Sequence, residues 1–277
     1  SGSAAATAAA YAALGIAGAS LALLVPWLRR RQRKAAILQE ASAAVAAEVA
    51  NCLWDFIIVG GGTAGCLLAN RLTSAAEGGS GRRVLVLEAG EADFMDRRIQ
   101  IPAGVLDLFR SKYDWDFRTC PADGEDPKRI ASGRGVYLCR GRVLGGSSSL
   151  NVMLYTRGDA KDYDTWEVDF GCRGWSAEEV LPYFRRTQDD RLGLAGSDPK
   201  HHGRGGEWSV DTVRYQNELS ARFLRACSEA GLPENPDFNC WARPQEGSGR
   251  FPVSQRRGAR LSAASALLAP ALLGGGG

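Results

Sequence analysis

The feature that most constrains the fold of this 277-residue chain is a glycine-rich turn that joins an apolar block to a helix-forming stretch. Residues 54–59 (Trp-Asp-Phe-Ile-Ile-Val) are rich in β-branched and aromatic side chains, which predicts a strand buried on both faces. Residues 60–65 (Gly-Gly-Gly-Thr-Ala-Gly) follow at once and contain the spacing G-x-G-x-x-G, and residues 66–76 have a helical pattern. The sequence therefore predicts a strand, a tight turn and a helix in succession.

The predicted unit continues into a second buried strand that ends in an acid. Residues 77–82 are polar and glycine-rich, as in a turn, and residues 84–88 read Val-Leu-Val-Leu-Glu. In such a βαβ unit the glycines let the main chain approach a pyrophosphate, which the N–H groups and dipole of the helix N-terminus attract. Glu88 is expected to accept hydrogen bonds from ribose hydroxyls. The pattern predicts dinucleotide binding rather than a purely structural turn, and it leaves open whether the ligand is FAD or NAD.

A second glycine cluster lies further along the chain. Residues 145–149 read Gly-Gly-Ser-Ser-Ser, a run that exposes backbone N–H groups and small hydroxyls to a closely approaching ligand. Such a run taken alone is more often a flexible loop. Here Arg142, Asn151 and apolar residues flank it, which is unlike a linker. The cluster is therefore a candidate second ligand-binding segment.

Together, these residues resemble the glucose-methanol-choline (GMC) family of flavoprotein oxidoreductases. The Gly60–Gly65 turn with residues 88–90 (Glu-Ala-Gly) resembles the family's FAD fingerprint. The family's first signature resembles residues 141–148 with Asn151, Tyr155, Gly158 and Asp164, and further matches at residues 101–103, 113–115, 174–176, 181–184, 202–206 and 237–239 extend the likeness from about Asp55 to Leu272. The resemblance implies an α/β fold, in which an FAD-binding Rossmann-like βαβ core is followed by the start of a substrate domain.

By this resemblance the cofactor is FAD, with Thr63 and Ala64 at the pyrophosphate and Glu88 at the ribose. The implied cofactor-binding residues are Gly60, Gly62, Thr63, Ala64, Gly65, Glu88, Leu144, Ser148, Asn151, Val152, Met153 and Leu154, the last six lying along the flavin and its linker. Some relatives attach FAD covalently through a histidine at the position where this chain has Leu150. Non-covalent FAD is therefore expected.

Flavin-dependent alcohol oxidation needs a base for the hydroxyl proton, usually a histidine. The chain has only His201 and His202, in a loop-like run where we expect solvated or turn-stabilising side chains. The family's catalytic histidine and its His/Asn partner belong to a C-terminal region with no counterpart here. We therefore predict no catalytic residue in this chain, and expect an N-terminal fragment or truncated gene product that is catalytically incomplete.

Three functions remain open at this point. FAD-dependent oxidation of a CH–OH group, as in choline and other alcohol dehydrogenases, is favoured, with hydride transfer to the flavin; residues 148–151 resemble those enzymes. Algal fatty acid photodecarboxylases share the signature, and residues 108–111, 214–217 and 237–241 resemble theirs. The substrate is thus a small-molecule alcohol or a fatty acid. The third hypothesis is a membrane-tethered FAD-binding fragment without chemistry of its own.

Charge and cysteine usage exclude other classes. After residue 50 the chain has 29 basic and 29 acidic residues, so it offers no electrostatic surface for a phosphate backbone, and no nucleic acid partner is expected. The seven cysteines form no C-x-x-C pair and no Cys/His cluster with metal-ligand spacing. We therefore expect free thiols and no metal site.

The N-terminal segment predicts a membrane anchor. Residues 4–28 carry no charge over a length that exceeds the about 20 residues a membrane-spanning helix needs, and five basic residues lie within 29–34. A single-pass anchor with the body on the cytosolic side is favoured, and a chloroplast or mitochondrial targeting peptide is the alternative. With a helical spacer at 35–50, the expected organisation is an anchor and spacer (1–50), an FAD-binding region (51–155), and the start of a substrate domain that returns to the FAD domain (156–277).

Overall fold

The structure is a computed structural model that describes residues 46, 47, 49, 51–75, 78, 81–119, 135–192 and 198–272. Contacts divide the chain into two units, Ser1–Trp54 and Asp55–Gly277. Residues 46, 47, 49 and 51 of the first unit are helical, and the rest of the predicted spacer at 35–50 lies outside the described residues. The predicted anchor at residues 4–28 lies outside the described residues. Within the described part of the chain, no helix combines the length and apolar character that a membrane crossing needs.

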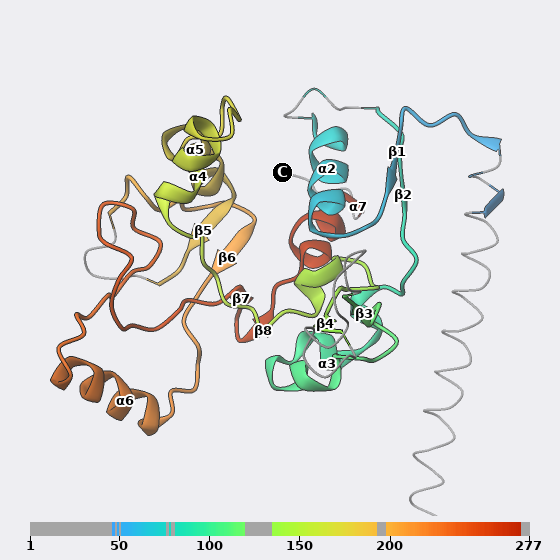
Figure 1. The fold of residues 1–277 in the computed structure, drawn as a ribbon. Helices are drawn as coiled ribbons and strands as arrows, with labels where there is room; N and C mark the ends of the chain where they lie inside the picture. Colours follow the sequence, from blue (N-terminus) through green and yellow to red (C-terminus); the bar gives the residue numbers. More distant parts are fainter. Residues whose placement is uncertain are drawn as a thin grey trace, which may run out of the picture. The chain divides into compact units, whose positions relative to one another are not determined.

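The second unit begins with the predicted βαβ unit (Figure 1). Strand β1 (Phe56–Val59) leads through the glycine turn into helix α2 (Thr63–Thr73), and strand β2 (Val84–Leu87) follows. The two strands are parallel, with Phe56 opposite Val84 and Val59 opposite Leu87. A parallel pair requires a crossover, and α2 supplies it. The predicted strand and helix are thus confirmed; β1 begins two residues later than the pattern suggested, and α2 begins and ends three residues earlier.

The expectation that β1 is buried on both faces is wrong. Ile57 and Val59 are 59% and 84% exposed, whereas Ile58 packs into a core formed by α2 and residues 261–268. The reason is that the described elements cover one face of this two-stranded sheet. An apolar, β-branched run predicts a strand, but it does not specify what covers each face.

A long excursion separates the βαβ unit from the second glycine cluster. It contains two 3₁₀ turns (η2, Asp93–Met95; η3, Pro102–Asp107), helix α3 (Arg97–Gln100) and the antiparallel strands β3 (Phe117–Arg118) and β4 (Tyr137–Leu138). Its side chains form a second core of Ile99, Leu108, Tyr113, Val143 and Leu150. The excursion thus packs against Val143 and Leu150, which flank the second glycine cluster.

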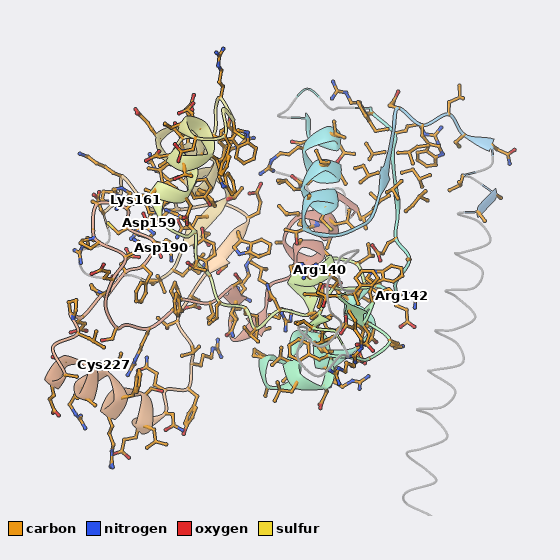
Figure 2. The ribbon with its side chains drawn as sticks, viewed as in Figure 1. Arg140, Arg142, Asp159, Lys161, Asp190 and Cys227 are labelled. Atoms are coloured by element: carbon orange, nitrogen blue, oxygen red, sulfur yellow. The ribbon has the colours of Figure 1, made fainter. Side chains whose placement is uncertain are left out.

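The rest of the chain forms further helices and short strands. They are the 3₁₀ turn η6 (Gly146–Ser149), helices α4 (Ala160–Val168) and α5 (Ala177–Thr187), parallel strands β5 (Gln188–Asp190) and β6 (Trp208–Val210), helix α6 (Glu218–Glu229), antiparallel strands β7 (Gln255–Arg256) and β8 (Ala259–Arg260), the π-helical turn η7 (Ala264–Leu268) and helix α7 (Ala269–Leu272). Helix α4 starts where it does because Asp159 caps it, accepting from the N–H of Lys161 at 3.0 Å (Figure 2).

The last described segment returns to the βαβ unit. Turn η7 packs against α2, and the Asn70 side-chain amide donates to the carbonyl of Leu267 at 2.8 Å (Figure 1). Cys66 and Ala69 of α2 are buried in the same core as Ala264 and Leu268. Helix α2 is therefore held between its own strands and a segment almost 200 residues later in the chain.

Candidate functional site

The two glycine clusters contact each other directly through their main chains. The N–H of Gly145 donates to the carbonyl of Gly61 at 2.7 Å. A Cβ atom on Gly146 would lie only 2.7 Å from the Cα atom of Gly62, and the side chain of Leu144 packs against Gly61. Close approach of two backbones needs glycine at the contact, because any side chain would separate them. The sequence-predicted segments are thus brought together although they lie some 80 residues apart.

Glu88 lies at this junction. Its Oε2 atom accepts the N–H of Gly61 at 2.8 Å, and its Oε1 atom accepts the N–H of Gly90 at 2.9 Å. The carboxylate is half-buried, and each oxygen keeps a lone pair beyond the one used. The side chain at the end of β2 is therefore aimed at the glycine turn and can still accept hydroxyl donors.

The start of α2 offers free donors. Gly62 is the N-cap residue and no side chain caps the helix; Thr63 and Ala64 are exposed. By helix geometry the N–H groups of the first turn have no acceptor within the helix, and the helix dipole gives this end a partial positive charge. Such an end binds phosphate groups.

Gly65 lets the turn close. A Cβ atom at this position would lie 2.0 Å from the carbonyl oxygen of Gly60, which is below any possible contact. At the next residue of the helix, the buried thiol of Cys66 donates to the carbonyl of Gly61 at 3.3 Å. Burial raises the pKa of Cys66 to about 11, so the thiol is neutral at pH 7 and adds no negative charge beneath the turn. These features together fit a dinucleotide pyrophosphate and its ribose.

The remaining predicted residues differ in their burial and in whether they contact this junction. The hydroxyl of Ser148 is buried, donates to the carbonyl of Gly145 at 2.6 Å and accepts the N–H of Ala263 at 2.8 Å. The exposed Asn151 accepts the N–H of Met153 at 3.0 Å. Residues 153–155 pair with residues 252–254 rather than with the first turn. Val152 and Leu154 are half-exposed and Met153 is buried.

Arg260 is a residue of this site that sequence reasoning missed. Its guanidinium is buried and donates to the carbonyl of Ile99 at 2.7 Å, to that of Ser148 at 3.1 Å and to Oδ1 of Asn151 at 2.9 Å. Burial lowers the pKa of Arg260 to about 10. The signal was absent from the sequence because a lone arginine 109 residues from Asn151 belongs to no local motif. Arg260 ties the excursion, the second glycine cluster and β8 together.

The two histidines differ in their surroundings. His202 is buried, with its Nε2 atom 2.7 Å from Oδ2 of Asp237 and its Nδ1 atom 3.2 Å from the side-chain amide of Gln188. Of the two expected alternatives, a solvated or a turn-stabilising side chain, burial excludes the first for His202, and a structural role fits. Burial is the largest single influence and acts to raise the pKa of Asp237, but the hydrogen bonds from His202 and from the N–H of Asn239, together with the nearby positive charge of Arg157, outweigh it and hold that pKa below its usual range. His201 is half-buried beside Asp198.

A parallel βαβ unit with a glycine-lined, uncapped helix start and an acid at the end of its second strand defines a dinucleotide-binding α/β protein. In this chain a second glycine segment also packs directly against the first. The chain belongs to the GMC oxidoreductase family, whose model matches residues 54–276. Both the resemblance stated from the sequence and the α/β fold class are thereby confirmed.

Individual relatives agree with this assignment. The chain is 42% identical over 224 residues to the chloroplastic fatty acid photodecarboxylase of Chlamydomonas reinhardtii, covering 80% of this chain and 33% of that protein. It is 39% identical over 226 residues to the mitochondrial choline dehydrogenase of Homo sapiens, covering 79% and 35%. The chain thus spans about a third of the length of these curated relatives.

Solved structures show the same fold. Pyridoxine 4-oxidase from Mesorbium loti matches with a TM-score of 0.66 and 35% identity over 78% of this chain and 39% of that one. Formate oxidase from Aspergillus oryzae matches with a TM-score of 0.61 and 28% identity over 76% and 36%.

The glycine turn predicts different effects for two neighbouring substitutions. Gly65→Ala forces a Cβ atom against the Gly60 carbonyl, so we expect the free energy of unfolding to fall by about 1–3 kcal/mol. In the matched variant Gly62→Ala the nearest heavy atom lies 4.0 Å from the new Cβ, so stability should change by less than about 0.5 kcal/mol. Urea denaturation measures both. Equal stabilities for the two variants would contradict the described turn.

Proposed function

We propose that this chain is the FAD-binding part of a flavoenzyme that oxidises the CH–OH group of a small-molecule alcohol by hydride transfer to the flavin. The observation that carries the proposal is the junction of two glycine clusters with Glu88, in a chain of the GMC oxidoreductase family. Neither cluster alone distinguishes a cofactor site from a structural turn. Their contact creates a surface of free N–H groups beside an acceptor carboxylate, which matches the two ends of an adenosine diphosphate group.

In this proposal the main-chain N–H groups at Gly62, Thr63, Ala64 and Gly65 bind the pyrophosphate, and Glu88 accepts the ribose hydroxyls. Gly60 shapes the turn, and Leu144, Ser148 and residues 151–154 line the flavin and its linker. FAD supplies the hydride acceptor. The protein's part is to orient the cofactor: Ser148 does so through the hydrogen bonds of its hydroxyl to Gly145 and Ala263, which hold the second cluster in place.

The surroundings of Leu150 support non-covalent attachment of FAD. The side chain is 1% exposed and packs in the second core against residues such as Ile99 and Tyr113. It presents no nucleophile to the flavin. We also assign no catalytic base to the described residues, because both ring nitrogens of His202 already face Asp237 and Gln188.

A second candidate is light-driven decarboxylation of a fatty acid on the same cofactor. The 42% identity to the Chlamydomonas photodecarboxylase supports it, as do the resemblances at residues 214–217 and 237–241. Alcohol oxidation stands first because choline dehydrogenases and a pyridoxine oxidase also match. The two candidates share every residue of the cofactor site.

The role of Glu88 can be tested by its removal. Glu88→Ala deletes the acceptor carboxylate, so we expect FAD affinity to fall by about 1–3 kcal/mol, which is about five- to 150-fold. Glu91→Ala is the control, since Glu91 is an exposed neighbour whose carboxylate pairs with Lys112. Equilibrium dialysis against a series of FAD concentrations, read by flavin absorbance, measures the FAD affinity of each variant. Unchanged FAD affinity in Glu88→Ala would refute the ribose contact.

The two candidate activities can be distinguished by assays of the longest natural protein that contains this chain, after it has been loaded with FAD. Bleaching of the flavin absorbance by an added alcohol such as choline, in the dark and without oxygen, is the expected result. Release of CO₂ from a long-chain fatty acid under blue light alone would favour the second candidate instead. FAD binding with neither reaction would leave a cofactor-binding module.

We further propose that residues 4–28 attach the protein to a membrane, with an organelle-targeting peptide as the alternative. The support is the uncharged segment followed by the basic run at 29–34. In cells expressing the full chain, the protein should remain in the membrane pellet after alkaline carbonate extraction. Release into the supernatant contradicts the anchor, and a shortened N-terminus after organelle import identifies a targeting peptide.

A further inference from the structure

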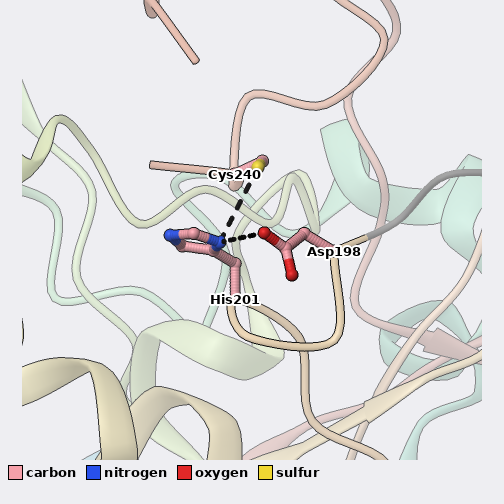
Figure 3. Close-up of side chains that lie close together, drawn as sticks. All are labelled: Asp198, His201 and Cys240. Carbon is pink, nitrogen blue, oxygen red and sulfur yellow. Dashed lines mark hydrogen bonds and ion pairs between the residues drawn. The ribbon is translucent and has the colours of Figure 1, made fainter. Parts of the chain in front are cut away.

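Three side chains of residue types that bind metals lie close together, although no metal-binding spacing joins them in the sequence. Asp198 and His201 lie in the turn before β6, and Cys240 lies in the loop after α6; their donor atoms are all within 4.8 Å of one another (Figure 3). The Nδ1 atom of His201 is 3.3 Å from Oδ2 of Asp198 and 3.9 Å from Sγ of Cys240. Cys240 is buried, whereas Asp198 and His201 are half-buried.

The geometry argues against a nucleophilic triad. In a Cys-His-Asp relay the two nitrogens of the imidazole face different partners, one the thiol and the other the carboxylate. Here the same nitrogen faces both, as the two dashed lines in Figure 3 show. Three donors directed at one region, rather than in a line, is the arrangement of ligands around an ion.

The donor separations agree with a tetrahedral shell. Zinc bonds of about 2.0–2.3 Å imply donor–donor distances of about 3.3–3.6 Å at the tetrahedral angle. The two measured distances, 3.3 Å and 3.9 Å, are close to this range. The third pair, Asp198 and Cys240, lies within 4.8 Å, so the thiol and the carboxylate must move closer together for all three side chains to bind one ion.

The main chain on both sides of the cluster is held in place. The guanidinium of Arg157 donates to the carbonyl of His201 at 2.5 Å and to that of Asn239 at 3.2 Å, bridging the two loops that carry the ligands. The neighbouring His202 bonds Asp237 across the same two loops. Asp198 uses Oδ1 for the N–H of Lys200 at 2.8 Å, which leaves Oδ2 facing His201. The cluster is thus preorganised by contacts that do not use its donor atoms.

We propose that Asp198, His201 and Cys240 bind a divalent transition-metal ion of the zinc class. A thiolate, an imidazole and a carboxylate form a borderline-soft ligand set that suits zinc better than magnesium or calcium. As the sulfur–metal bond forms, the Cys240 thiol gives up its proton to solvent, and a water molecule fills the fourth position. No metal site is expected from the sequence, because Cys240 follows His201 by 39 residues and no spacing rule joins them. The site is separate from the proposed cofactor site.

The test uses the full chain after chelator treatment. Isothermal titration with Zn²⁺ should show one equivalent bound, and Co²⁺ should produce a thiolate-to-metal charge-transfer band in the near ultraviolet. Cys240→Ser should abolish the band and weaken Zn²⁺ binding by at least about tenfold. Cys227→Ser, at a buried cysteine of α6 outside the cluster (Figure 2), should leave both unchanged.

A second variant guards against misfolding of Cys240→Ser. His201→Asn changes a half-buried side chain and should weaken Zn²⁺ binding to a similar extent, with the urea midpoint measured for every variant. Absence of Zn²⁺ binding by the wild-type chain, or a charge-transfer band that persists in Cys240→Ser, overturns the proposal. So does loss of the band in Cys227→Ser, since the thiolate ligand would then lie elsewhere.

Discussion

The structure of the proposed cofactor site depends on one main-chain contact, the hydrogen bond from the N–H of Gly145 to the carbonyl of Gly61. It places the second glycine cluster directly on the fingerprint turn. Gly62 and Gly146 can then approach without side chains between them. If either turn were displaced, the free N–H groups of α2 and the carboxylate of Glu88 would no longer share a surface with the second cluster. The arrangement of the proposed cofactor site therefore depends first on backbone packing.

That contact is supported from the far end of the chain. Ser148 joins the second cluster to Ala263, and η7, which follows Ala263 directly, packs against α2. The fingerprint helix and the second cluster are thus both held by the same late segment. The match to the GMC oxidoreductase family likewise extends over residues 54–276 and does not stop at the βαβ unit. The late segment is needed to bring the earlier ones into register.

Features that depend on neighbouring residues could be predicted from the sequence, whereas features that depend on contacts between distant segments could not. The βαβ unit and the placement of Glu88 depend on local patterning, and the prediction of both was close. The exposure of β1, the burial of His202 and the ligand cluster around His201 depend on which distant segments meet. A histidine in a Gly-rich loop looks solvated until Asp237, 35 residues later, is packed against it. Local composition contains no information on that pairing.

Arg260 shows how this site tolerates a buried cation. Its side chain loses most of its hydration, which is why its pKa falls to about 10, and no carboxylate pairs with it among the described residues. Three oxygen acceptors from two segments, the excursion and the second glycine cluster, replace part of the lost hydration. Each is fixed by the others, because removal of one acceptor would leave a desolvated charge less well satisfied. The guanidinium therefore holds the side chain of Asn151 and the main chain at Ser148 in one arrangement, and an arginine outside any local motif fixes the conformation of the second cluster.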